Sequence, residues 1–170
     1  MLKKVVITGM GVVSCLGHDV NKFWDSLLAG KSGVKLISKF DTSEFSTKFA
    51  GEINDFDPLL YMSQKEKNRT DLFDQYAMSA SISALNMAGL NAENMTTEQK
   101  ENTSVLIGSG MGGMQTYYNG SIRLFQNGPQ KVKPSFITST ILNMASGRVA
   151  KRFGFMGMSY SICSACATSS

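Results

Sequence analysis

The stretch that decides the fold is Ser161-Ile162-Cys163-Ser164-Ala165-Cys166-Ala167-Thr168-Ser169-Ser170, at the end of the sequence. Residues 159–162 have the alternation and β-propensity of a strand, and the small residues after them can open a buried helix. A cysteine at a helix N-terminus has its thiolate stabilised by the helix dipole and by unpaired backbone N–H groups. The stretch therefore predicts a strand, a turn and a nucleophilic thiol at Cys166. Cys163 falls within the expected strand and is interpreted as an inert core thiol.

The rest of the sequence predicts strands that alternate with helices. Residues 2–8 indicate a buried strand, and apolar residues at helical spacing indicate a helix from Val20 to Leu28, ended by Gly30. Asp71 is expected to cap a helix that ends at Gly89 and has an apolar face of Leu72, Phe73, Tyr76, Ala77, Ala80 and Ala84. The other expected elements are short strands within 31–70, a polar connection over 91–102, a strand over 103–107, a helix from Gly113 to about Phe125 and a helix from Ser139 to Phe153, closed by Gly154. This order favours an α/β fold with a mostly parallel sheet and helices on its faces.

Composition limits the classes of protein to which the chain can belong. A hydrophobic content of 42% over 170 residues can form the core of one ordinary domain and excludes a disordered chain. No stretch approaches the roughly 20 apolar residues of a membrane span, and Met1-Leu2-Lys3-Lys4 leads into a strand rather than a signal-peptide core. Three cysteines, one in a nucleophile-like setting, fit a reducing compartment. We expect a cytoplasmic protein, or an organelle-stromal one.

Charge is distributed unevenly along the chain. The formal net charge is +4, yet residues 103–170 carry six basic side chains and no Asp or Glu. This part of the chain cannot supply an acid/base carboxylate to Cys166, and it favours anionic partners. A solvated basic face explains the same pattern equally well.

Several segments, in the same order along the chain, resemble the β-ketoacyl-[acyl-carrier-protein] synthases, the condensing enzymes of fatty-acid synthesis. The segment Ser164-Ala165-Cys166-Ala167-Thr168-Ser169 is similar to the nucleophile motif of this family. The other similar segments are residues 5–11, 40–43, 48–51, 108–113 and 140–144. The resemblance covers the whole chain, and several collinear motifs are more specific than any single glycine pattern.

The resemblance implies a particular fold and reaction. Residues 1–170 correspond to the N-terminal half of a thiolase-like layered α/β fold, truncated just after the nucleophile motif. Cys166 takes an acyl group from a carrier protein, and decarboxylation of malonyl-carrier then gives the carbanion that attacks the acyl thioester. The histidines and lysine that the family uses lie in the second half, so residues 1–170 alone are expected to be inactive. No cofactor is implied beyond the phosphopantetheine arm of the carrier, and the full-length protein is expected to be a homodimer without nucleic-acid partners.

Gly108, Gly110 and Gly113 match the G-x-G-x-x-G pattern of a dinucleotide site, after a predicted strand. The acidic residue expected about 20 positions later is missing, because no Asp or Glu follows Glu101. Glycines that let the backbone turn at a strand end explain the pattern without a ligand. The resemblance instead implies that this loop borders an acyl pocket gated by Met111. Taken alone, Met111 fits ordinary packing. The predicted substrate-binding residues are Gly110, Met111, Gly112 and Phe136.

Two alternatives concern the cysteines and the basic residues. Cys15, His18, Cys163 and Cys166 could in principle hold a zinc ion, but Cys163 within a strand and Cys166 beyond its end need not converge, so we expect no metal. Lys65, Lys67 and Arg69 resemble the carrier-docking segment of the family, or form ordinary solvated surface. A non-catalytic or truncated paralogue and a thiolase acting on CoA thioesters are the alternative functions.

Overall fold

The computed structural model describes residues 4–168, in which helices predominate over strands. The helices are α1 Val20–Leu28, α2 Gln64–Lys67, α3 Leu72–Met87, α4 Thr97–Glu101, α5 Met114–Asn127 and α6 Met144–Phe153. The strands are β1 Lys35–Leu36, β2 Phe49–Ala50, β3 Val105–Leu106 and β4 Ser159–Tyr160. Single turns of 3₁₀ helix lie between them: η1 Pro58–Leu60, η2 Ala92–Asn94, η3 Pro129–Lys131, η4 Ile137–Ser139 and η5 Ala165–Ala167.

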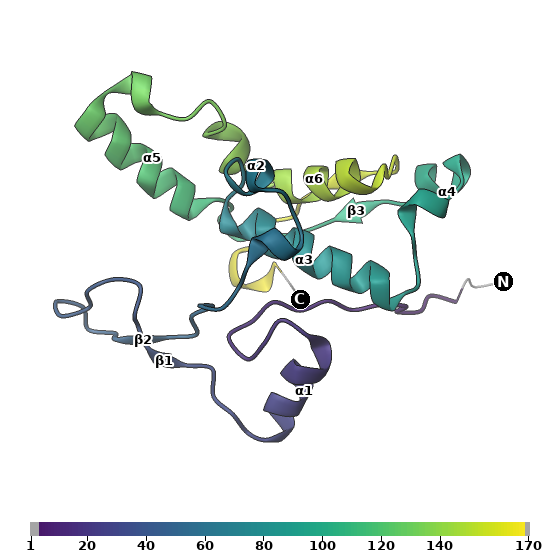
Figure 1. The fold of residues 1–170 in the computed structure, drawn as a ribbon, viewed down its shortest axis with the longest axis horizontal. Coiled ribbons are helices and arrows are strands. Elements are labelled where there is room, and N and C mark those ends of the chain that lie inside the picture. Colours follow the sequence, from purple (N-terminus) through teal and green to yellow (C-terminus); the bar gives the residue numbers. More distant parts are fainter. Residues whose placement is uncertain (1–3, 169–170) are drawn as a thin grey trace.

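The main hydrophobic core lies where α3, α6, β3 and β4 meet, and we call these four elements the packed layer (Figure 1). Met78 of α3, Val105 of β3 and Val149 and Ala150 of α6 are buried there together with Met62. Helix α6 packs against α3 and also against both strands. Burial of these apolar side chains is the main force that stabilises the packed layer.

Local capping sets the ends of the helices in the packed layer. The Asp71 carboxylate accepts a hydrogen bond from the backbone N–H of Phe73 at 3.4 Å, which confirms Asp71 as the predicted cap of α3. Gly154 follows α6 with a φ of +70°, a left-handed conformation that glycine adopts at little cost.

The predicted helix at residues 20–28 is confirmed as α1, where the Asp19 side chain caps the N-terminus.

The sheets are smaller than the predicted mostly parallel sheet. Strands β3 and β4 pair in parallel, whereas β1 and β2 form a separate antiparallel pair. The strand predicted over 103–107 is therefore confirmed at its centre, and the last strand is limited to Ser159 and Tyr160. Within residues 4–168, helix α6 packs on β3 and β4, while Leu106 and Tyr160 stay half exposed.

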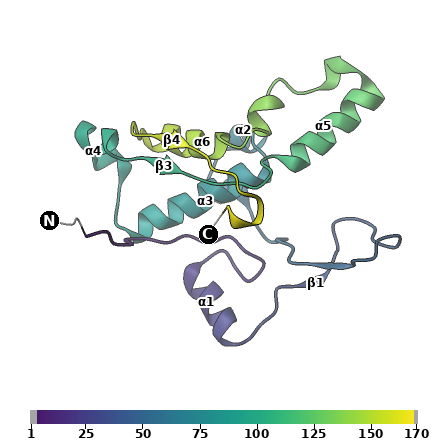
Figure 2. The same ribbon diagram turned by 180° about the vertical axis from the view of Figure 1, so that it is seen from behind.

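The first part of the chain, residues 4–57, which we call the N-terminal arm, packs loosely on the rest. The strand predicted over residues 2–8 is wrong for residues 4–8, which pair with no strand among the described residues; residues 2 and 3 lie outside the described range. The side chains of Val5 and Ile7 are 91% and 85% exposed. A strand needs a neighbouring strand for its backbone hydrogen bonds, and none reaches this segment. The arm then loops away from α3 and α6 through α1 and the β1–β2 pair (Figures 1 and 2).

Glycines hold the arm against the packed layer at one place. A Cβ atom at Gly9 or Gly11 would collide with the carbonyl oxygen of Ala84 or Ala80, so the arm runs directly along the backbone of α3. Only residues without a side chain allow so close an approach. The two glycines therefore fix where the arm leaves α3.

Three further predictions need correction. The buried side of α3 consists of Asp74, Gln75, Met78 and Ser79 rather than the predicted apolar face. Gln75 donates to the Lys67 carbonyl at 3.3 Å and Asp74 faces Arg148 of α6, so polar partners as well as the core cover this side. The polar connection over 91–102 contains α4, whose Thr96 and Gln99 form a capping box. The helix expected from Ser139 begins at Met144, since Ser139 is buried at the end of η4 and its hydroxyl donates to the Arg69 carbonyl at 2.8 Å.

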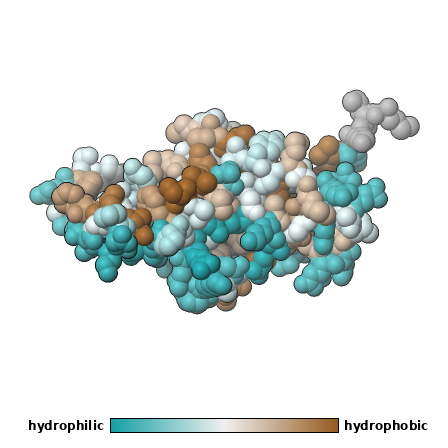
Figure 3. Space-filling view, turned by 90° about the horizontal axis from the view of Figure 1, so that it is seen from above, coloured by the Kyte–Doolittle hydropathy of each residue, from teal (hydrophilic) through white to brown (hydrophobic). Residues whose placement is uncertain are grey.

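Apolar side chains remain open to solvent on several parts of the surface. Figure 3 shows brown, apolar groups among teal ones, including on the side of the molecule where Figure 1 places α5. Phe125 of α5 is 92% exposed, and Tyr118 and Leu124 of the same helix are more than half exposed. Among residues 4–168, no helix combines the length and the apolar character that crossing a membrane requires.

Candidate active site

Cys166 lies on a sharp turn just beyond the end of β4. Ala165, the residue before it, has a φ of +52° and is the one non-glycine residue with positive φ in the described part of the chain. A left-handed alanine is strained by roughly 1 kcal/mol or more, so the turn must be held by its surroundings. Thr168 supplies part of this support, because its hydroxyl oxygen accepts the Ser164 N–H at 2.9 Å and its hydroxyl donates to the Ala165 carbonyl at 2.7 Å.

The turn leaves the cysteine accessible. Cys166 is exposed, and its backbone N–H donates to no backbone acceptor among residues 4–168. An exposed thiol next to an unpaired N–H group has the two features that acyl transfer needs, a nucleophile and a donor for the oxyanion. Of the helix expected from this stretch, the described residues form only the 3₁₀ turn η5, and the rest of that expectation falls on residues outside the described range.

The glycine-rich loop, residues 108–113, packs directly against this turn. The Ser109 N–H donates to the Ile162 carbonyl at 3.4 Å, and a Cβ atom at Gly108 would lie 2.5 Å from Thr168 Cγ2. A Cβ atom at Gly110 would lie 3.6 Å from the Ala165 carbonyl oxygen. The structure thus brings the predicted residue Gly110 next to the cysteine turn. The glycines permit this close approach of the loop to the cysteine turn, so no bound dinucleotide is needed to explain them.

Cys163 differs from its prediction. It lies in the loop after β4 rather than in a strand, and it is exposed rather than part of the core. Its thiol donates to the Gly110 carbonyl at 3.3 Å. Strand β4 ends at Tyr160, and the Ser109 N–H still donates to the Ile162 carbonyl beyond it, so Cys163 follows directly as a contact with the glycine-rich loop.

The other predicted substrate-binding residues lie at different places. Met111 is at the apex of the glycine-rich loop with 67% of its surface exposed. Gly112 has a φ of +68° and its N–H donates to the Ser109 hydroxyl at 3.0 Å. Phe136 packs on α5, where a Cβ atom at Gly120 would collide with its ring and its centroid lies 6.1 Å from that of Tyr117. Phe136 therefore makes its contacts with α5, not with the cysteine turn.

The three predicted docking residues lie on or just after α2. Lys65 and Arg69 are exposed and Lys67 is half-buried. Ser63 and Glu66 form a capping box that fixes the helix, and hydrogen bonds from Ser63 to the Glu66 carboxylate hold the pKa of Glu66 below its usual value. Beside α2 lies a hollow of about 570 Å³, and its charged lining residues are Lys65, Glu66, Arg69, Asp74, Arg148, Lys151 and Arg152.

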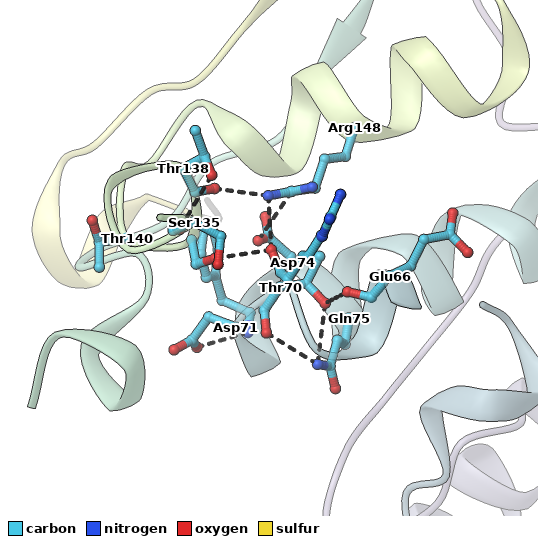
Figure 4. A network of polar contacts seen from close by, with 12 residues as sticks. Glu66, Thr70, Asp71, Asp74, Gln75, Ser135, Thr138, Thr140 and Arg148 are labelled. Carbon is cyan, nitrogen blue, oxygen red and sulfur yellow. Dashed lines mark hydrogen bonds and ion pairs between the residues drawn. The ribbon is translucent and has the colours of Figure 1, made fainter. Parts of the chain in front are cut away.

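A polar network in the wall of this hollow was not predicted from the sequence (Figure 4). The Arg148 Nε atom lies 3.3 Å from the Asp74 carboxylate, whose side chain is 1% exposed. Burial raises the pKa of Asp74 to about 6, although the positive charge of Arg148 opposes the shift. The only signal in the sequence was Asp74, the single charged residue in the helix that Asp71 was expected to cap.

The residues considered for zinc are placed differently from a metal site. His18 Nε2 pairs with Asp55 at 2.9 Å, and Cys15 packs near Gly33 and Gly51. Across residues 4–168, no three His, Cys, Asp or Glu side chains gather closely enough to hold a metal ion.

Comparison with known proteins gives the class of the protein. A family model described as the N-terminal domain of β-ketoacyl synthase matches residues 2–170. The chain therefore belongs to the β-ketoacyl synthase family. Among curated relatives, it is 43% identical over 166 residues to 3-oxoacyl-[acyl-carrier-protein] synthase 2 of Vibrio harveyi. It is 42% identical over 167 residues to the chloroplastic 3-oxoacyl-[acyl-carrier-protein] synthase I of Arabidopsis thaliana. The matches cover 98% of this chain but only 39% and 35% of the relatives.

Solved structures agree on the fold. The ishigamide ketosynthase/chain length factor superposes with a TM-score of 0.83 at 26% identity, over 95% of this chain and 40% of that one. The AntDE ketosynthase, solved with an acyl-carrier protein, superposes with a TM-score of 0.72 at 19% identity, over 92% of this chain and 40% of that one. The α/β class and the relation to ketosynthases are thereby confirmed.

Proposed function

We propose that residues 1–170 form the N-terminal half of a 3-oxoacyl-[acyl-carrier-protein] synthase in which Cys166 accepts the acyl group. The observation that carries the proposal is the exposed Cys166 on the strained Ala165 turn, packed against the glycine-rich loop. The relatives of 43% and 42% identity bear this activity in their names, and this chain spans less than half of their length.

In the proposed reaction, the Cys166 thiolate attacks the carbonyl carbon of an acyl thioester on the carrier. A sulfur–carbon bond forms to Cys166 while the bond to the carrier's phosphopantetheine sulfur breaks, and that leaving sulfur takes a proton. The Cys166 N–H is one donor to the oxyanion. Malonyl-carrier then loses CO₂, and the carbanion attacks the Cys166 thioester and releases the thiol. No metal or further cofactor takes part in this scheme.

The partners and the complete architecture belong to the same proposal. The carrier docks through Lys65, Lys67 and Arg69, since basic side chains that reach the surface attract an acidic partner. A neighbour of the same fold was solved with an acyl-carrier protein, which supports this partner class. A second half completes a mostly parallel sheet with helices on both faces, and two such chains form a homodimer. Bacterial and chloroplastic relatives support a bacterial cytoplasm or an organelle stroma as the location.

The test is acylation and condensation by the complete protein that contains residues 1–170. We expect Cys166→Ser to lower the rate of acyl transfer from acyl-carrier by roughly 10³-fold or more, because the nucleophile is lost. Cys163→Ser is the matched control and is expected to retain most activity. Full activity of Cys166→Ser would overturn the proposal. Activity with acyl-CoA but not with acyl-carrier would favour a thiolase, and folded protein with no turnover would favour a non-catalytic paralogue.

A further inference from the structure

Arg148 joins three segments that are distant in the sequence (Figure 4). From α6, its Nη2 atom donates to the Arg69 carbonyl at 3.1 Å and to the Thr138 carbonyl at 2.8 Å. Its Nε atom lies 3.3 Å from Asp74 of α3. The Arg69 carbonyl also accepts the Ser139 hydroxyl. Residues 68–71, which we call the docking loop, are thus tied by one side chain to α3, α6 and η4.

The docking loop is also connected to the glycine-rich loop. The second oxygen of the Asp71 carboxylate accepts the backbone N–H of Thr116 at 2.7 Å, in the first turn of α5 and directly after the glycine-rich loop. The Gly113 N–H donates to the Thr140 carbonyl at 3.0 Å, just after η4. Two contiguous paths therefore run from the docking loop to the loop that packs on the cysteine turn.

Stability alone is a poor explanation for the Arg148–Asp74 pair. Asp74 is almost completely buried, and neither of its carboxylate oxygens has a well-aligned hydrogen bond among the described residues. Replacement of such a buried ion pair by apolar residues is often neutral or stabilising. A pair that contributes little net stability but fixes three segments has the character of a positioning device.

We propose that Arg148 is a positioning residue that holds the docking loop in register with the glycine-rich loop. A carrier protein bound at Lys65 and Arg69 then presents its thioester to Cys166. Arg148 touches no reacting atom and acts through the main chain of Arg69 and Thr138. Asp74 orients the Arg148 guanidinium toward these carbonyls. This inference rests on the proposed function.

The first test separates an effect on the KM for acyl-carrier from an effect on the chemical step. In the complete protein, Arg148→Leu should raise the KM for acyl-carrier about tenfold and change kcat and the kinetics with a carrier-free pantetheine thioester less than about twofold. Arg148→Lys keeps the charge and can reach one carbonyl, so its KM for acyl-carrier should lie between those of the parent and Arg148→Leu. It replaces Arg148→Leu in the test if that variant does not fold. Lys151→Met removes one positive charge from the same helix without touching Arg69, so it should raise this KM less than about twofold.

A double-mutant cycle shows whether Arg148 acts through the docking loop. Because both changes would damage the same docking loop, Arg69→Glu should raise the KM less in the Arg148→Leu background than in the parent. Additive effects, an equal rise for carrier-free substrate, or an unchanged KM for acyl-carrier would each overturn the proposal.

Hydrogen exchange of the Thr116 amide tests the same positioning without activity. We expect this amide to exchange about tenfold faster in Arg148→Leu, with no change in Lys151→Met. If the parent does not turn over acyl-carrier, the proposed function fails, and the exchange rates still decide the role of Arg148. Unchanged exchange in Arg148→Leu would contradict that role.

Discussion

The packed layer and the N-terminal arm both contain many apolar residues, but only the packed layer buries them together. In the packed layer, Met78, Val105 and Val149 bury their side chains against one another. In the arm, Val5 and Ile7 face solvent, and only Gly17 and Ser26 are buried among residues 4–57. An apolar pattern thus gives a core only where a second apolar face reaches it. The cysteine turn follows β4 of the packed layer and is hydrogen-bonded to the glycine-rich loop that follows β3.

The glycine-rich loop gives the largest expected effect. Gly113→Ala should lower the free energy of unfolding by roughly 3 to 5 kcal/mol, because the new Cβ atom collides with the Ser139 carbonyl oxygen. Gly147→Ala is the matched control within α6, where no atom lies within 4 Å of the added Cβ. It should stabilise the protein by about 0.5 to 1 kcal/mol through helix propensity. Chemical denaturation measures the free energy of unfolding of both variants. Equal changes in the two variants would mean that the loop does not pack tightly on η4.

Asp74 should make the packed layer sensitive to pH. Its pKa is raised to about 6 by burial, with Arg148 and Asp71 as the charged groups that act on it. Because the unfolded carboxyl has a pKa near 3.9, the folded state binds the proton more tightly. This contribution to stability is present below about pH 4 and is lost as pH rises through 6, on the order of 3 kcal/mol in total.

The variant Asp74→Asn tests this pH dependence. It keeps the size of the side chain but removes its titration, so the difference in unfolding free energy between variant and parent should change between pH 4 and 7. Denaturation curves that keep a constant offset at all pH values would contradict the assignment.

Single truncations compare the two regions directly. Val149 is 4% exposed, so Val149→Ala should cost about 2 kcal/mol, the sum of lost burial and a residual cavity. Ile7 is 85% exposed, so Ile7→Ala in residues 1–170 should cost less than about 0.5 kcal/mol. A cost above 1 kcal/mol for Ile7→Ala, measured by urea denaturation, would mean that the arm is buried and that the contrast is wrong.

Substitutions of Met111 separate packing from substrate selection. In the complete protein, Met111→Phe should block acylation by long chains and spare short ones, and Met111→Ala should widen the range. Each methylene is worth roughly 1 kcal/mol in such a pocket. Acylation rates for a series of chain lengths measure this. Unchanged selectivity with lower thermal stability would assign Met111 to packing.

Sequence signals that act within a few residues predicted more of the fold than signals for contacts between distant segments could. The ends of α1 and α3 were predictable because Asp19 and Asp71 cap them within a few residues. The cysteine turn was predictable for the same reason, since small residues follow a β-rich segment. The strand predicted over residues 2–8 failed for residues 4–8, because pairing needs a distant partner that the sequence pattern does not reveal.

The polar network was beyond prediction for a related reason. Asp74 and Arg148 meet only because α3 and α6 pack together, and neither residue marks this contact in the sequence. The position of Phe136 on α5 likewise depends on the path of residues 128–136, which no periodic pattern specifies.

The most direct test of the account compares the two neighbouring thiols in the complete protein. Cys163 donates to the Gly110 carbonyl, whereas Cys166 lies at a turn with an unpaired N–H among the described residues that can stabilise a thiolate. Iodoacetamide labelling followed by mass spectrometry of the peptides should show alkylation of Cys166 well before Cys163, with Cys166 protected by prior incubation with acyl-carrier. Equal labelling of both thiols, or labelling of Cys166 that acyl-carrier does not slow, would contradict the claim that Cys166 is the acyl acceptor.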